Sequence, residues 1–273
     1  MTGKPRGDLD FGGSTLEAAA AFWASCAPGG RAYTTGRIDL RGALAFVRLM
    51  RGLPTLEVRL SDDAAGGRIR AHLQERVVMG ALPKHRLAQG VLVVPASIEE
   101  YLRGRSRRAL RTNMSRAAHT GITVEPLLTA ATKRGVLKQY ADATPGEWQL
   151  EWQSRAAEDG RIWLAAWDCE SRLVGLMIAT VDVEWAMLEV GIAREQCARW
   201  LLHHTLVERL RDSGARYMLT YPRNALSITA GARYLQRLLG YRVFNLSLRR
   251  ARLRGRNVRD GEVARKAQLT RGA

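Results

Sequence analysis

The chain has 273 residues, with 43 lysines and arginines against 26 aspartates and glutamates, which gives a formal net charge of +17. This length allows one large or two small domains with a substantial core. So strong a positive charge favours a polyanionic partner, nucleic acid first and an anionic membrane surface second. No apolar run is long enough to span a membrane, which excludes a membrane-spanning protein. We therefore expect nucleic acid, and no membrane, as the partner.

The three cysteines, Cys26, Cys169 and Cys197, are scattered and include no pair with CxxC spacing. They form no metal-binding motif, and their odd number is typical of a reducing compartment. Residues 1–13 contain no apolar stretch of the kind found in secretion signals. We therefore expect a cytoplasmic protein without a metal site.

The first third of the chain is predicted to be a flexible tail over residues 1–14 and a small α/β unit over residues 15–96. Apolar spacing in this unit predicts helices at 16–27 and 40–51 and strands at 54–60, 68–73 and 90–94. Nothing in these residues indicates a particular chemistry.

A basic helix is predicted to link the two halves of the chain over residues 97–121. Ser97 and Glu100 form a capping-box pattern at its start, and Gly121 is a C-terminal stop. Six arginines follow Glu100 with no acidic residue among them: Arg103, Arg105, Arg107, Arg108, Arg111 and Arg116. A solvated basic face is the alternative, but the coincidence with the net charge favours contact with a nucleic-acid backbone.

A further helix start is predicted at residues 144–147, which read Thr-Pro-Gly-Glu. Two tryptophans and two glutamates then follow at i, i+4 spacing. The tryptophans could stack a base or line an aminoacyl pocket, and the carboxylates could hold an ammonium group; a core pair with a solvated edge is the alternative. The predicted aminoacyl or acceptor pocket comprises these four residues and Tyr221, that is, Glu147, Trp148, Glu151, Trp152 and Tyr221.

The second half reads as a meander of strands followed by a helix, a strand and a helix. The predicted strands are 161–168, 173–183, 185–193 and 217–221, and the predicted helices are 200–213 and 225–239. Gly214 and Gly240 stand where helix ends need a left-handed residue. Glu189 is the one acid on the strand face that it shares with Trp185 and Met187.

This element order, ended by Gly240-Tyr241, resembles the core of the GNAT (Gcn5-related N-acetyltransferase) superfamily over residues 122–250. The family's turn after its fourth strand reads Arg/Gln-x-x-Gly-x-Gly/Ala, and its glycine N–H groups close on the pyrophosphate of coenzyme A. Here Arg194 fits the first position, but Cys197 and Arg199 replace the glycines. The turn therefore offers two cations in place of an open backbone cradle.

A second departure from the family concerns its general acid. The family commonly places a tyrosine four residues before the Gly-aromatic pair, and this chain has Gln236 there. Tyr234 is nearby but lies roughly 200° away around the helix. Both departures weaken the expectation of an acyl-CoA donor.

The basic helix and the strand that follows it, at residues 121–124, resemble a segment of the FemABX branch of GNAT-fold enzymes. That branch, like some GNAT-type enzymes of natural-product pathways, takes an aminoacyl group from aminoacyl-tRNA. The resemblance implies an aminoacyltransferase that uses aminoacyl-tRNA as co-substrate, without another cofactor. It would acylate an amine of a small molecule or peptide and form an amide.

The resemblance also suggests roles for single residues. Glu189 is the candidate general base, with exposure at a strand end or pairing with Arg194 as the alternative. His203 and Tyr234 are further catalytic candidates, and His204 is expected at the surface. The tRNA-binding set is the six arginines of the basic helix with Arg194, Arg199, Arg249, Arg250, Arg252, Arg254 and Arg256. The last of these belong to a basic tail predicted over 251–273.

The sequence thus predicts an α/β (α+β) fold, with a GNAT-like, mixed and mostly antiparallel sheet flanked by helices and a smaller N-terminal α/β unit. Two other functions stay open. One is an N-acyltransferase that uses acetyl-CoA or another acyl-CoA through a degenerate loop. The other is a non-catalytic GNAT-like protein that binds nucleic acid.

Overall fold

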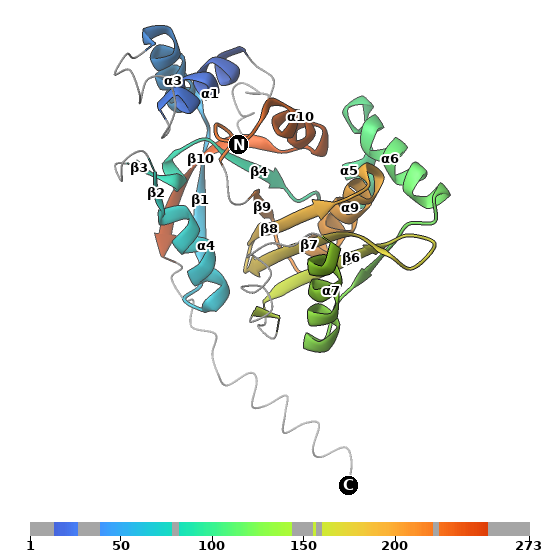
Figure 1. Ribbon diagram of the computed structural model, residues 1–273. Helices are drawn as coiled ribbons and strands as arrows, with labels where there is room; N and C mark the ends of the chain where they lie inside the picture. The colour runs from blue at the N-terminus through green and yellow to red at the C-terminus, as the bar shows by residue number, and fades with distance from the viewer. Residues whose placement is uncertain are drawn as a thin grey trace.

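The computed structural model of the protein describes residues 14–26, 39–77, 82–143, 155–156, 160–220 and 224–250. Within this part of the chain, eight strands form one sheet in the order β1-β10-β4-β9-β8-β7-β6-β5 (Figure 1). Two neighbouring pairs, β1 with β10 and β8 with β9, are parallel, and the other five are antiparallel. The predicted fold class, a mixed and mostly antiparallel sheet flanked by helices, is confirmed.

The strands and helices of the described residues have the following bounds. The sheet contains β1 (Thr55–Leu60), β4 (Gln89–Val93), β5 (Thr123–Pro126), β6 (Arg161–Trp167), β7 (Leu173–Asp182), β8 (Trp185–Ala193), β9 (Tyr217–Thr220) and β10 (Arg242–Arg250), with a separate pair β2 (Arg76–Val77) and β3 (Leu82–Pro83). The helices are α1 (Ser14–Cys26), α3 (Leu40–Gly52), α4 (Ala64–Gln74), α5 (Ile98–Leu102), α6 (Arg108–His119), α7 (Ala130–Ala143), α9 (Gln196–Asp212) and α10 (Ala230–Leu239), with short 3₁₀ turns η1 (Lys84–Arg86) and η2 (Arg105–Arg107).

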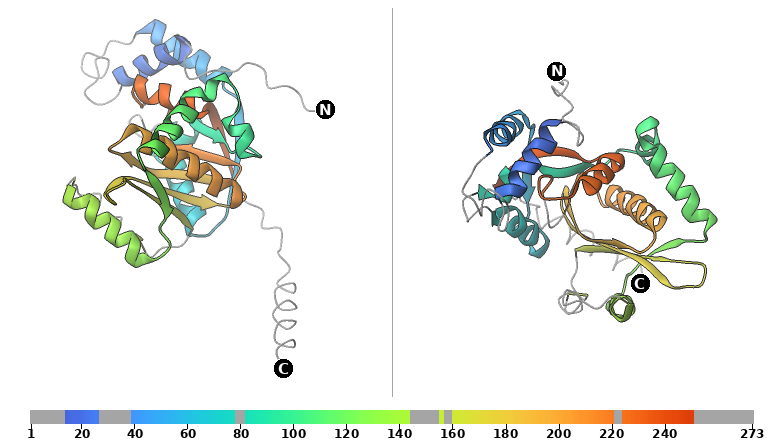
Figure 2. Two further views of the ribbon diagram at one scale, coloured as in Figure 1. Left: turned by 90° about the vertical axis from the view of Figure 1, so that its right-hand side faces the viewer. Right: turned by 45° about the horizontal axis from the view of Figure 1, so that its top comes forward.

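The two faces of β7 show why this strand has no polar face. Met177 and Ala179 point into the cluster that contains α9, whereas Leu176 and Ile178 point into the cluster that contains α7. Figure 2 shows α9 and α7 on opposite sides of β6 and β7. A strand covered on both faces reads as a continuous apolar run, and this explains the sequence of residues 173–181. A third cluster lies between α4 and β1, β8 and β10.

The sheet crosses the predicted boundary between the two halves of the chain. β1 and β4 come from residues 15–96, yet β10 lies between them and pairs with both. The register joins Thr55 to Asn245 and Val91 to Arg242. The domain boundaries themselves stay a prediction, but β1 and β4 belong to the same sheet as the strands of the second half of the chain.

The predicted strand at residues 68–73 is wrong, because these residues belong to helix α4. Asp63 caps this helix, and its carboxylate accepts a hydrogen bond of 2.8 Å from the Gly66 N–H. Ile69 and Leu73 are fully buried at the i, i+4 spacing of one helix face. Six residues that alternate polar and apolar fit both periods, and here the cap and the buried face favour the helix.

The single helix predicted over residues 97–121 is interrupted. The predicted cap at Ser97 is confirmed, since its hydroxyl accepts a hydrogen bond of 3.1 Å from the Glu100 N–H. Helix α5 then ends at Leu102, and Gly104 adopts a φ of 92° before η2 and α6 begin. A positive φ breaks a right-handed helix, and glycine is the residue that adopts it without strain. The arginines therefore lie on a bent segment and not on one continuous helix.

Two helix starts also differ from prediction. Helix α9 begins at Gln196, four residues before the predicted start. Helix α10 begins at Ala230, five residues after its own predicted start, and Thr229 caps this helix. Before this cap, the side chain of Asn224 accepts hydrogen bonds from the backbone of two following residues and holds a turn.

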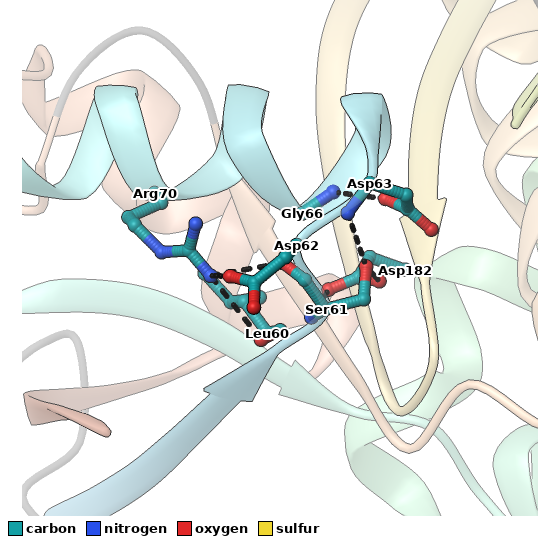
Figure 3. Close-up of polar contacts among 7 residues, drawn as sticks. All are labelled: Leu60, Ser61, Asp62, Asp63, Gly66, Arg70 and Asp182. Atoms are coloured by element: carbon teal, nitrogen blue, oxygen red, sulfur yellow. Dashed lines mark hydrogen bonds and ion pairs between the residues drawn. The ribbon is translucent and has the colours of Figure 1, made fainter. Parts of the chain in front are cut away.

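A buried carboxylate ties the β1–α4 corner to the end of β7 (Figure 3). Asp182, 3 % exposed, accepts hydrogen bonds of 3.0 Å from the Ser61 N–H and 2.5 Å from the Ser61 hydroxyl. Arg70 donates to the Ser61 carbonyl oxygen at 2.9 Å and pairs with Asp62 at 3.1 Å. A Cβ at Gly66 would lie 2.3 Å from that carbonyl oxygen, so the close approach of α4 requires glycine.

Candidate functional site

The sheet opens into a fork between β8 and β9. The parallel pairing joins residues 185–188 of β8 to residues 217–220 of β9. Beyond Leu188, β8 continues to Ala193 and pairs with β7 alone among the described strands. Glu189 therefore lies at the point where the two strands separate, and Ala193 lies roughly 13 Å further along the extended strand.

A pocket of about 400 Å³ lies at the end of the fork. One wall comes from the end of β8 and the first turns of α9, and the other comes from α10. The lining residues are Ala193, Arg194, Gln196, Arg199 and Trp200 on the first wall and Gly231, Tyr234, Leu235 and Leu238 on the second. We call this the α9–α10 pocket.

The α9–α10 pocket is rich in N–H donors. Arg194 is exposed, with its guanidinium 6.0 Å from the centre of the Tyr140 ring. The Arg199 Nε and the Trp200 Nε1 are buried, and neither has a hydrogen-bond partner among the described residues. The N-terminal turn of α9 adds backbone N–H groups that have no intrahelical partner, together with the positive end of the helix dipole. Such a set of donors suits an anionic group.

The residues that replace the family's glycines differ in position. Cys197 is 6 % exposed, packs in the core cluster of α9 and does not line the α9–α10 pocket. Its Sγ lies 3.7 Å from a carboxylate oxygen of Glu195, the residue before α9, whose side chain makes no capping hydrogen bond. Arg199 does line the pocket, so its side chain takes space that a glycine would leave open.

The Glu189 side chain is buried and ion-paired, and its partner is Arg161, not Arg194 as in the alternative to a general base. Its Oε1 accepts a hydrogen bond of 3.2 Å from the Arg161 Nε–H and another from the Thr180 hydroxyl. The exposed fractions of the Glu189 and Arg161 side chains are 5 % and 0 %. Both contacts are to Oε1, so within the described residues neither of them occupies Oε2. The role of Glu189 as a base stays a prediction.

Glu189 also lines a second cavity, of about 380 Å³, on the α4 side of the sheet. Met187 and residues of α4 contribute to this cavity. One of these α4 residues is His72, which sequence reasoning missed. Burial, with a smaller contribution from Lys84, lowers the pKa of His72 to about 4. No sequence signal indicated His72, because its segment was predicted to be a strand.

His203 is buried behind the α9–α10 pocket and does not line it. The Tyr101 hydroxyl donates to the Leu239 carbonyl oxygen at 3.1 Å, so this hydroxyl accepts the hydrogen bond of 3.2 Å from the Nδ1–H of His203. The Nε2 then accepts a hydrogen bond of 3.1 Å from the Tyr241 hydroxyl. This chain joins α5, α9 and the end of α10. His204, expected at the surface, is also buried.

The buried His203 makes stability depend on pH. Burial lowers its pKa to about 3 from the ordinary value of 6.5, so between these values the unfolded chain binds a proton that the folded protein does not. The contribution to stability is complete above pH 6.5 and is lost as the pH falls, by about 2 kcal/mol at pH 5. Urea unfolding at pH 7 and pH 5 should show a smaller loss for His203→Phe than for the wild type. Equal losses in the two proteins would contradict this assignment.

The predicted tRNA-binding arginines separate into two groups. Arg107 lies over the Tyr101 ring at 5.4 Å and donates to the Leu238 carbonyl oxygen at 2.8 Å. Its guanidinium also packs against Gly240, because a Cβ added to this glycine would lie 2.0 Å from the Arg107 Nη2. Arg111 is exposed but donates to backbone carbonyls at the helix break. These two arginines hold the bend and the end of α10. The remaining arginines of the segment are exposed: Arg103, Arg105, Arg108 and Arg116.

The bent basic segment lies beside the α9–α10 pocket. Helix α6 packs along α9 and touches α10, whose residues 231–238 form one wall of the pocket (Figure 1). Tyr234 is 56 % exposed on that wall, with the Arg237 guanidinium 5.2 Å from its ring centre. Gln236 has a buried Oε1 without a partner among the described residues.

Several predicted site residues lie elsewhere. Arg249 is on β10, next to the edge strand β1, and lies 3.8 Å from Glu57 of that strand; Arg250 ends β10. The others lie outside the described residues: Glu147, Trp148, Glu151, Trp152, Tyr221, Arg252, Arg254 and Arg256. Their roles stay predictions. None of the helices in the described part of the chain combines the length and apolar character needed to cross a bilayer.

Comparison with known proteins gives partial likenesses in structure alone. No family model and no curated protein matches the sequence. FemX is similar at 11 % identity, with a TM-score of 0.41 over 58 % of this chain and 59 % of FemX. The C-terminal domain of a putative lysylphosphatidylglycerol synthetase from Agrobacterium fabrum is similar at 13 % identity, with a TM-score of 0.35 over 48 % of this chain and 45 % of that one. The aminoglycoside 6'-N-acetyltransferase AAC(6')-Ih from Acinetobacter baumannii shares 13 % identity, with a TM-score of 0.35 over 44 % of this chain and 90 % of that enzyme.

The chain spans about half the length of the first two of these structures. At such scores the likenesses concern part of the fold and carry no argument about activity. The GNAT-like character of the fold is found in the chain's own topology. An antiparallel meander β5–β8 is followed by α9, by β9 parallel to β8, and by α10 and β10.

Proposed function

We propose that the protein is a GNAT-fold aminoacyltransferase that uses aminoacyl-tRNA as donor and forms an amide with an amine acceptor. The observation that carries the proposal is the α9–α10 pocket. Its lining residues include the exposed Arg194 together with Arg199 and Trp200, whose buried Nε and Nε1 atoms have no hydrogen-bond partner among the described residues. A buried donor without a partner costs about 1–3 kcal/mol, and an anionic ligand would satisfy both.

The surroundings of the pocket favour a nucleic acid over coenzyme A as the bearer of that anion. Coenzyme A in GNAT relatives needs backbone N–H groups freed by glycines, and Arg199 fills this space. The exposed Arg105 and Arg108 lie on the segment that packs beside α10. A cationic surface that extends beyond the pocket suits a phosphate backbone.

The proposed reaction takes place at the fork. The terminal phosphates of the tRNA would be held by Arg194 and Arg199, with the 3′ end directed along β8 towards Glu189. The acceptor amine attacks the ester carbonyl, a C–N bond forms, and the C–O bond to the ribose breaks. The proton lost by the amine passes to Oε2 of Glu189 and from there, relayed through the neighbouring ribose hydroxyl, to the ribose oxygen as it leaves. The cavity lined by Glu189 and His72 would admit the amine.

Arg199→Gln tests the pocket directly. Loss of one charge-assisted contact to phosphate should weaken aminoacyl-tRNA binding about 10- to 100-fold, with little change in the rate of the bound complex. Arg216→Gln is the matched control, because this exposed arginine pairs with Glu184 at the opposite end of β9. Filter binding at about 50 and 200 mM salt measures both affinity and its salt dependence. Equal binding by the two variants would contradict a role for Arg199.

The donor is identified by comparing ligands on the wild-type protein. Tighter binding of charged than of deacylated tRNA, with amide formation and no stabilisation by coenzyme A, is the expected result. The survival of Arg194 at the first motif position favours the acyl-CoA alternative as the second candidate. A clear thermal shift with coenzyme A and weak, unselective tRNA binding would establish that alternative. Binding of nucleic acid without amide formation would indicate the non-catalytic protein.

A further inference from the structure

Helix α3 presents an apolar stripe to solvent. Leu40, Leu44 and Val47 are 75 %, 58 % and 42 % exposed. At 100° per residue these side chains fall within an arc of about 60° on one face of the helix. Scattered exposed leucines are ordinary on protein surfaces, but three at i, i+4 and i+7 on one helix form a continuous surface.

The opposite face of α3 is fixed to the rest of the protein. Leu49 is 2 % exposed, and Phe46 stacks on Trp23 of α1 with ring centres 5.9 Å apart. Gly42 permits this close packing, since a Cβ there would lie 2.8 Å from the Cβ of Phe22. In Figure 1, α3 lies at the outer edge of the molecule with α1 between it and α10. The stripe is therefore the outer face of a firmly held helix.

Cations flank the stripe on one side. Arg41, Arg48 and Arg51 are all exposed, and α3 contains no acidic residue. Arg51 lies within the arc of the apolar residues, while Arg48 and Arg41 lie roughly 40° and 60° beyond Leu44. An exposed apolar strip bordered by arginines is the composition of helices that lie in the interface of an anionic bilayer.

We infer that α3 is a docking surface for an anionic lipid bilayer, with its axis in the plane of the membrane. Leu40, Leu44 and Val47 would enter the headgroup region while the arginines contact lipid phosphates. This occupant fits better than two others. A symmetric contact between two copies would bring two sets of three arginines together. Nucleic acid would gain little from the stripe, because it contains no aromatic side chain on which a base could stack.

This inference is independent of the proposed function and differs from the expectation of no membrane partner. That expectation rested on the lack of a spanning segment, and a helix that lies on the surface needs none. Docking of this kind also accounts for part of the high positive charge without invoking nucleic acid.

The test uses the full chain and sedimentation with vesicles of phosphatidylcholine, alone or mixed with phosphatidylglycerol at roughly 7:3. The variant Leu40→Gln with Leu44→Gln removes two apolar side chains, keeps the charge and retains good helix formers. We expect the wild type to bind the mixed vesicles and this variant to bind them about tenfold or more weakly. The matched control is Leu128→Gln, which alters an 81 % exposed leucine outside α3 and should bind as the wild type does.

A second pair of variants tests the cations of α3. Arg48→Gln with Arg51→Gln should weaken binding to the mixed vesicles roughly 10- to 30-fold. Arg105→Gln with Arg116→Gln removes the same charge from the basic segment and should have a smaller effect. Binding of tRNA should be weakened more by Arg105→Gln with Arg116→Gln than by Arg48→Gln with Arg51→Gln. Failure of the membrane inference can therefore be distinguished from failure of the proposed function.

Three results would overturn the inference. Equal vesicle binding by Leu40→Gln with Leu44→Gln and by the wild type would show that net charge alone attracts the lipid. A wild-type dimer that this variant converts to a monomer would assign the stripe to a contact between copies. A thermal unfolding midpoint that is several degrees lower in Leu40→Gln with Leu44→Gln than in the wild type, with vesicle binding unchanged, would show that another part of the chain covers the stripe.

Discussion

Replacement of Glu189 by alanine is expected to lower the free energy of unfolding by about 3–5 kcal/mol. The Glu189 side chain is 5 % exposed, and its carboxylate accepts hydrogen bonds from Arg161 and Thr180. Its removal takes a carboxylate acceptor from the Arg161 guanidinium, whose side chain is fully buried, and from the Thr180 hydroxyl. Loss of one partner of a buried ion pair is among the costlier effects of a point mutation.

Urea unfolding monitored by circular dichroism measures this loss. Glu189→Gln keeps the shape and an acceptor oxygen, so its loss should be smaller, about 1–3 kcal/mol. Glu184→Ala is the matched control, because that glutamate is 44 % exposed and pairs with Arg216 at the surface. It should change stability by about 1 kcal/mol or less. A Glu189→Ala protein as stable as the Glu184→Ala control would mean that the buried pair is absent in solution.

This result bears on how the base is tested. A lower rate in Glu189→Ala could reflect a disturbed fork as easily as a missing base, because the same side chain serves both purposes. Glu189→Gln, assayed well below its unfolding midpoint, separates the two. A folded Gln variant with normal donor affinity and a strongly reduced rate supports proton transfer at Glu189, whereas an unchanged rate excludes it.

Asp182→Ala is expected to lower the free energy of unfolding by about 2–4 kcal/mol. The substitution removes the acceptor of both the Ser61 N–H and the Ser61 hydroxyl, and these donors lie at a corner where α4 leaves no room for adjustment. Because the contact joins residues 121 positions apart, its loss should loosen α4 from β7 and not merely fray a loop.

Asp62→Ala provides the control for this corner. Asp62 belongs to the same cluster, but its side chain is 66 % exposed and pairs with Arg70 at 3.1 Å, so its loss should cost about 1 kcal/mol or less. A double-mutant cycle with Ser61→Ala and Asp182→Ala should give a coupling energy of about 1 kcal/mol or more. Additive effects would contradict a direct bond between the two side chains.

The sequence was most informative where the local pattern and the tertiary environment agree. β6, β7 and β8 were predicted closely, because long apolar runs separated by short turns have few alternative structures. The left-handed ends at Gly214 and Gly240 were also predicted, since few residues adopt that conformation readily. The segment of α4 was misassigned because six alternating residues fit two periods. The break at Gly104 depends on a backbone angle that no neighbouring residue specifies.

The candidate site could be predicted in part for the same reason. Arg194 and Arg199 lie five residues apart, on either side of the start of α9 and close to the end of β8, so their meeting in one pocket follows from local structure. The partners of Glu189 are different. Arg161 is 28 residues away and reaches Glu189 across β7, which requires the register of three strands. His72 reaches the same cavity from α4, and no local pattern in the sequence encodes that approach.

The position of β10 between β1 and β4 has a consequence for biosynthesis. Residues 55–93 leave the ribosome early, but the strand that fits between them is translated only at residues 242–250. Until then β1 lacks its sheet partner and one edge of β4 stays open, and unpaired edges attract strands of other chains. The nascent chain therefore has to hold β1 and β4 without their shared partner during the synthesis of about 150 residues. Sheets built from such distant strands form slowly. Chaperone capture during translation would protect these edges, and the last strand would release the chain by closing the sheet.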